Sequence, residues 1–139
     1  MAWIRGVAAG LLCVVAMAPP AWADGPGGVV DSGAVSRAVG SGVRDGALIG
    51  YTATGPTNDL AASAVIAACQ SAGATECTSD EESNDAVCIV SVGADDGSGV
   101  VSGGAGPTIE AARDDAFGHV STAHLTFAPN ARILASSCV

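Results

Sequence analysis

The sequence predicts an α+β protein built from two tandem half-repeats. Gly55-Pro56-Thr57 closes an apolar run and opens a helix-like run, and Gly106-Pro107-Thr108 stands in the same setting 51 positions later. Each copy also has strand-like segments before a helix-like one. A two-stranded half cannot stand alone, so we expect both halves to share one core, with two helices packed on one face of a mainly antiparallel sheet. The same offset aligns further residues: Asp45-Gly46 with Asp96-Gly97, Ile49 with Val100, Asp59 with Glu110, and Ala61 with Ala112.

The first 23 residues have the pattern of a signal peptide. Arg5 gives a small basic region, an uncharged and mostly apolar run of 12 residues follows at 7–18, and Ala21-Trp22-Ala23 fits the cleavage signal. Because 12 residues at about 1.5 Å each cannot cross roughly 30 Å of hydrocarbon, the run fits a signal peptide better than a membrane anchor. We expect no membrane span after cleavage. The expected location is secreted or extracytoplasmic, in the cell envelope.

Cleavage would leave 116 of the 139 residues, which is enough for one domain with a modest core. Residues 24–34 are Gly-rich and predict a flexible tail. Residues 35–139 are expected to form a single duplicated α+β domain, with halves of about 35–85 and 86–139.

In the first half, Asp45-Gly46 predicts a hairpin turn and residues 47–54 a strand. Residues 58–71 predict a helix, because Thr57 can act as its N-cap and Asp59 places a negative charge in its first turn. Its apolar stripe is mostly alanine, which buries little area, so the core needs staples. This stripe consists of Leu60, Ala61, Ala64, Val65 and Ala68.

Residues 77–85 turn sharply polar and predict an exposed loop.

In the second half, residues 86–93 predict an apolar strand, residues 95–99 a turn, and a return strand begins at residue 100. Thr108 is the expected N-cap of a second helix, with Glu110 in its first turn. Residues 132–138 predict a closing strand. The apolar face of the second helix is Ile109, Ala112, Ala116, Phe117 and Val120.

The charge of the chain excludes two classes of partner. It has 14 acidic residues, five arginines and no lysine, for a formal charge of −9, which becomes −10 when Arg5 leaves with the signal peptide. Binding to phosphates requires clustered lysine and arginine. We therefore expect no nucleic-acid partner and no attraction to an anionic membrane surface.

Four cysteines remain after Cys13 leaves with the signal peptide, and an even set in an exported chain is typical of disulfides rather than of a metal site. Four cysteines allow three pairings. We favour Cys69 with Cys77, which ties the end of the first helix to the next segment. The other favoured pair is Cys88 with Cys138, which we expect to tie strands from different halves.

Several short segments together carry a family resemblance: Ile49-Gly50-Tyr51, Ala67-Ala68-Cys69, Cys77, Ala86-Val87-Cys88-Ile89-Val90 and Ser137-Cys138. This arrangement resembles the domain of unknown function family 4189, whose members are small exported bacterial proteins with a duplicated, cysteine-bearing layout. The resemblance covers about residues 35–139. Because the activity of the family is unassigned, the resemblance implies fold and export but no chemistry.

The chain departs from the family pattern in two places. Two further family cysteines correspond here to His119-Val120 and Ala131-Arg132, as if one disulfide were lost, and this supports the local pairing of Cys69 with Cys77. The family's apolar strand after the cysteine corresponding to Cys77 is replaced by the acidic run. The resemblance therefore does not predict whether the first half of this chain has that strand.

The acidic run Asp80, Glu81, Glu82 and Asp85 is the candidate interaction surface. It lacks the spacing of a calcium-binding loop, so we expect a solvated loop, no metal and no cofactor.

The chain has two histidines, His119 and His124, which we expect to be exposed at a helix end. A histidine with Asp114 or Asp115 and a serine (Ser121 or Ser136) can be combined into a hydrolase triad, but no nucleophile-elbow motif supports one. We therefore assign no catalytic residue. The expected function is a secreted, non-enzymatic interaction module that acts through its surface on another protein or a cell-envelope component. A small secreted hydrolase with a histidine and carboxylate pair, and a structural envelope protein, are the alternatives.

Overall fold

The computed structural model describes residues 35–139; the predicted signal peptide (1–23) and tail (24–34) lie outside the described residues. The described part contains two copies of strand, strand, helix, strand. The first is β1 (Ser36–Arg44), β2 (Ala47–Gly55), α2 (Asn58–Ser71) and β3 (Thr75–Ser83). The second is β4 (Cys88–Gly93), β5 (Val101–Gly106), α3 (Ile109–Thr122) and β6 (Arg132–Ser137). The α+β class and the tandem half-repeats are confirmed.

Each copy forms its own three-stranded antiparallel sheet, in the orders β2-β1-β3 and β5-β4-β6. Within each copy the third strand returns beside the first and fills its second edge. The central strand therefore has no free side for a strand of the other copy. The strands form two sheets in place of the one shared sheet that we expected.

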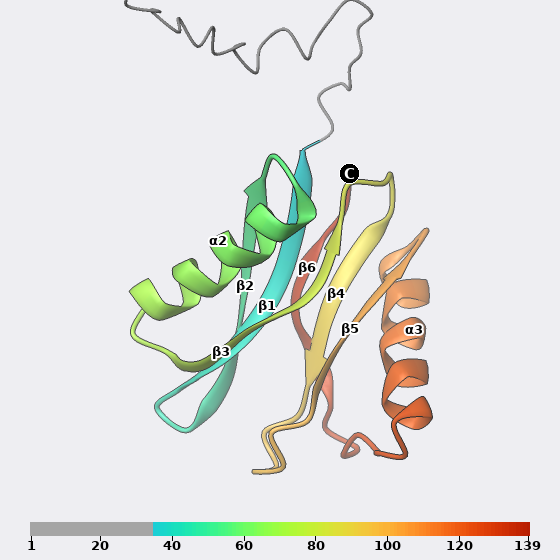
Figure 1. The fold of residues 1–139 in the computed structure, drawn as a ribbon. Coiled ribbons are helices and arrows are strands. Elements are labelled where there is room, and N and C mark those ends of the chain that lie inside the picture. Colours follow the sequence, from blue (N-terminus) through green and yellow to red (C-terminus); the bar gives the residue numbers. More distant parts are fainter. Residues whose placement is uncertain (1–34) are drawn as a thin grey trace, which may run out of the picture. The chain divides into compact units, whose positions relative to one another are not determined.

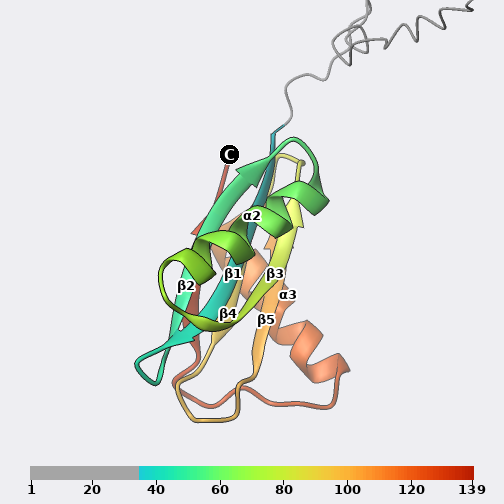
Figure 2. The ribbon, with the colours of Figure 1, turned by 60° about the vertical axis from the view of Figure 1, so that its left-hand side comes forward.

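The two sheets pack face to face, and each helix covers the outer face of its own sheet (Figure 1). The rotated view shows α2 and α3 on opposite sides of the strands (Figure 2). We had expected both helices on one face. Strand β1 contacts β4, β2 contacts β6, and β3 contacts β5, so the two copies are arranged as an approximate two-fold pair.

Two glycines allow the sheets to approach closely at equivalent places. A Cβ atom on Gly50 of β2 would overlap the backbone of Leu134 in β6, and one on Gly103 of β5 would overlap the backbone of Asp80 in β3. Any larger residue would push the sheets apart at these points.

The helices begin as the sequence predicts. The Thr57 hydroxyl accepts a hydrogen bond from the Leu60 N–H at 3.2 Å, and the Thr108 hydroxyl accepts one from the Ala111 N–H at 3.1 Å. Each helix then packs a small apolar core onto its sheet. These cores centre on Ala38, Ala61 and Val65 in the first copy and on Cys88, Val90, Val92, Ala112 and Ala116 in the second.

Both favoured disulfides are present, Cys69–Cys77 and Cys88–Cys138, with sequence separations of 8 and 50 residues. Disulfides are typical of oxidising compartments. The second bridge does not tie the two halves, contrary to our expectation. Cys88 begins β4 and Cys138 follows β6, which is the neighbour of β4 in the same sheet.

Neither α2 nor α3 is long and apolar enough to cross a membrane.

Candidate functional site

The polar run expected to be an exposed loop forms most of strand β3 (Thr75–Ser83). It pairs with β1 as an edge strand, and its Asp80 side chain reaches Ser91 of the other sheet. The space between the sheets is itself lined by hydroxyl groups, which explains how a strand can lack the usual apolar pattern.

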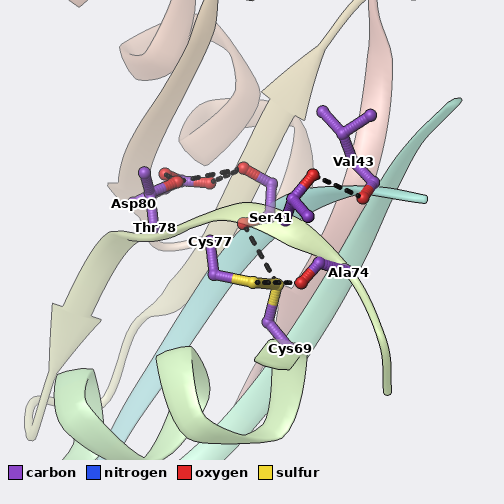
Figure 3. Close-up of a disulfide and its surroundings, with 8 residues drawn as sticks. Ser41, Val43, Cys69, Ala74, Cys77, Thr78 and Asp80 are labelled. Carbon is purple, nitrogen blue, oxygen red and sulfur yellow. Dashed lines mark hydrogen bonds between the residues drawn. A yellow bond between two sulfur atoms is a disulfide. The ribbon is translucent and has the colours of Figure 1, made fainter. Parts of the chain in front are cut away.

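The Asp80 carboxylate lies between the two sheets and receives three hydroxyl groups. Its Oδ2 accepts hydrogen bonds from Ser41 Oγ of β1 at 2.7 Å and from Ser91 Oγ of β4 at 2.5 Å, and its Oδ1 accepts one from Thr78 Oγ1 at 2.7 Å. Both serines are buried. Figure 3 shows Asp80, Ser41 and Thr78 beside the Cys69–Cys77 disulfide. Asp80 therefore links the sheets.

Two irregularities in β3 direct its acidic side chains. Val39 pairs with Glu81 but Gly40 pairs with Ser79, so Asp80 is an extra residue in the ladder. A second register shift follows between Ser41 and Val43, opposite residues 75–78. Such bulges change the direction of a side chain.

The structure separates the predicted acidic surface into different environments. Burial raises the pKa of the Glu81 carboxyl, His119 opposes that rise, and Glu82 and Asp115 add to it. Glu82 accepts a hydrogen bond from Ser79 Oγ at 3.3 Å. Asp85 is exposed, and its N–H donates to Ser83 Oγ at 2.9 Å. With Asp80 between the sheets, the interaction role of this set stays a prediction.

The side chains of His119 and Asp115 cap the outer edge of strand β5. His119 Nδ1 lies 2.7 Å from the Gly103 carbonyl oxygen and must be the donor, because a carbonyl only accepts. Asp115 Oδ2 accepts a hydrogen bond from the Ala105 N–H at 3.0 Å. His119 Nε2 is 3.6 Å from Asp115 Oδ1, and the two side chains are 54% and 42% exposed.

His124 follows α3 in a left-handed backbone conformation, with φ of 59°, and is exposed as expected. His119 is exposed too, but it is tied to the edge of β5.

Two adjoining cavities of about 170 and 150 Å³ lie between the first sheet and the β4–β5 connection. We call them the inter-sheet groove. They share Val43, Leu48, Glu76 and Gly99, and no histidine or cysteine of residues 35–139 lines either of them. The first is also lined by Gly46, Ala94, Asp95 and Gly97, and the second by Ser41, Thr78 and Val101.

The two carboxylates of the inter-sheet groove differ in what they contact. Asp95 Oδ1 accepts a hydrogen bond from the Leu48 N–H at 2.7 Å, and its Oδ2 lies 3.0 Å from the Arg132 guanidinium. The Leu48 N–H and then Arg132 hold the pKa of Asp95 below its usual value. Glu76 is exposed, and its carboxylate has no hydrogen bond or ion pair with any described residue.

Sequence reasoning missed Glu76. It has a left-handed backbone, with φ of 53°, which is uncommon for a residue other than glycine. Nothing in the sequence distinguishes it from its polar neighbours, because the conformation arises from the pairing of β3 with β1. Among the described residues, no group of three or more His, Cys, Asp or Glu side chains is placed to hold a metal ion.

A scan against protein-family models, a search of curated proteins and a search of solved structures each found no match for this chain.

Proposed function

We propose that the chain is a secreted, disulfide-stapled, non-enzymatic interaction module that binds a protein partner through the inter-sheet groove. The observation that carries the proposal is a groove with mostly apolar walls and one carboxylate, that of Glu76, which the described part of the chain does not use. Such a concave surface with few polar groups is typical of binding sites.

The other inward polar groups support this choice of surface. The Asp80 carboxylate is occupied by three hydroxyl groups, and Asp95 by Leu48 and Arg132. His119 and Asp115 are occupied at the edge of β5. Because these groups already have partners within the fold, we place recognition at the inter-sheet groove.

Export is the second part of the proposal. It is supported by the signal-peptide pattern of residues 1–23, by the two disulfides and by the resemblance to the domain of unknown function family 4189.

Affinity capture with the mature chain tests the proposal. Val101 lines the groove and is half-buried, so Val101→Phe should fill the second cavity. Leu60 on α2 is 53% exposed and does not line the groove, so Leu60→Phe is the matched control. We expect extracellular and envelope fractions to yield a protein that the wild type and Leu60→Phe retain and Val101→Phe loses.

Equal retention by Val101→Phe, checked to have an unchanged melting temperature, would contradict the groove as the contact surface. A parallel variant with Glu82→Gln and Asp85→Asn tests the acidic run. Loss of the partner in that variant alone would move the interaction surface to β3 and the segment that follows it. Recovery of no partner with any of these chains would count against an interaction module.

A further inference from the structure

The polar side chains of Ser41, Thr78 and Glu76 offer acceptors to the inter-sheet groove. Ser41 and Thr78 line the second cavity, and each has a single hydroxyl proton that it donates to Asp80. Ser41 Oγ and Thr78 Oγ1 are 3.3 Å apart. They do not bond each other while both donate to Asp80, because a hydroxyl group has only one proton to donate. Asp80 therefore fixes both hydroxyls so that only their lone pairs remain for a ligand.

The one unoccupied charge of the groove has the same character. Glu76 lines both cavities, and its carboxylate accepts hydrogen bonds without donating any. Among the described residues, no arginine or histidine lines either cavity. A negatively charged ligand would meet the Glu76 carboxylate without a basic side chain to offset it, and is therefore disfavoured.

The remaining walls are apolar. Val43 and Leu48 lie in both cavities, and Val101 and Ala94 lie in one each. Cavities of about 170 and 150 Å³ are too small for a folded segment but suit one long side chain. A matching ligand has an alkyl stem for these walls and ends in N–H donors with a positive charge.

We propose that the inter-sheet groove binds the basic side chain of a protein partner, with the Glu76 carboxylate facing its guanidinium or ammonium group. This rests on the proposed function and names the chemistry that the groove selects. Complementary charge supports it, because the mature chain has a formal charge of −10, with 14 acidic residues and four arginines. The guanidinium is the better fit, since it is weakly hydrated and offers five donors to acceptors on two sides.

Nuclear magnetic resonance titration of the mature protein with N-acetyl-arginine methylamide tests the inference. The neutral citrulline analogue is the matched ligand. We expect saturable shifts at the amides of groove residues with the arginine probe, at roughly millimolar concentration. We expect none with citrulline. Glu76→Gln should weaken binding about five-fold, the effect of an exposed charge contact.

Glu110→Gln removes the same charge from an exposed position at the start of α3 and should leave the affinity unchanged. Val101→Phe should abolish binding without any change of charge. Equal affinity for arginine and citrulline probes, an unchanged affinity in Glu76→Gln, or shifts that never saturate would overturn the inference. The capture experiment with Val101→Phe separately decides whether the groove is a protein-binding surface at all.

Discussion

At the scale of single residues, Asp80 is one of the side chains that join the sheets. It is the extra residue of a bulge in β3, and the bulge turns its carboxylate to Ser41 of one sheet and Ser91 of the other. A buried hydroxyl that loses its partner is costly, because water cannot replace the hydrogen bond. The stability of the sandwich should therefore depend on this one side chain.

We expect Asp80→Ala to lower the free energy of unfolding by about 3 kcal/mol, because the buried hydroxyl groups of Ser41 and Ser91 lose their acceptor. Urea denaturation at neutral pH with the disulfides intact measures this. Asp114→Ala, at an exposed site in the middle of α3, should change stability by less than about 0.5 kcal/mol. If the two substitutions changed the free energy of unfolding equally, the hydroxyl groups around Asp80 would not stabilise the fold.

At the scale of elements, an acidic and a basic side chain bond the outer edge of the second strand of each hairpin, β2 and β5. On β2, the Leu48 N–H donates to Asp95 and the Leu48 carbonyl accepts from Arg132 at 2.9 Å. On β5, Asp115 accepts from the Ala105 N–H and His119 donates to the Gly103 carbonyl oxygen. An uncapped edge offers its backbone to other strands, so these pairs protect the edges from unwanted pairing.

The cap on β2 makes a pH prediction. Because the folded state lowers the pKa of Asp95, its contribution is present above the unfolded value of about 3.9 and is lost as pH falls through the folded value. We expect Asp95→Asn to lose less melting temperature than the wild type between about pH 5 and pH 2. Asp114→Asn, an exposed control on α3, should follow the wild type. Parallel curves for Asp95→Asn and the wild type would refute this role.

Elements differed in how well the sequence predicted them. The helices were predictable because their signals are local, and Thr57 and Thr108 act as the caps that their positions indicate. Strand β3 was not, because its bulges break the alternation of side chains and its polar residues face hydroxyl groups from other strands. Asp80 could be named as a candidate but not placed, and Glu76 could not be named, since both depend on non-local pairing.

At the scale of the whole molecule, two similar copies are held together without a disulfide between them. Each bridge lies within a single copy: Cys69–Cys77 in the first and Cys88–Cys138 in the second. The contacts across the copies include Arg37 of β1, which donates to the carbonyl oxygens of Val87 at 2.7 Å and Ser137 at 2.8 Å. In sequence, residues 84–87 are the only connection between β3 and β4.

A cut in that connection gives a test at this scale. A protease site inserted after the exposed residue Asn84 should be cleaved in the folded protein. We expect the nicked protein to remain one particle in non-reducing solution at high concentration. Its melting temperature should fall on dilution, whereas that of the uncut protein should not. Sedimentation and calorimetry measure both. A concentration-independent melting temperature after nicking would contradict this.

The placement of the disulfides thus makes the chain a tethered dimer. Four residues keep each copy at a high effective concentration beside the other, of the order of millimolar for a short flexible linker. The interface between the sheets can then include hydroxyl groups and closely approaching glycines beside its apolar side chains, where an obligate dimer is more uniformly apolar. One cleavage event would turn stability from a property of one chain into a property of its concentration.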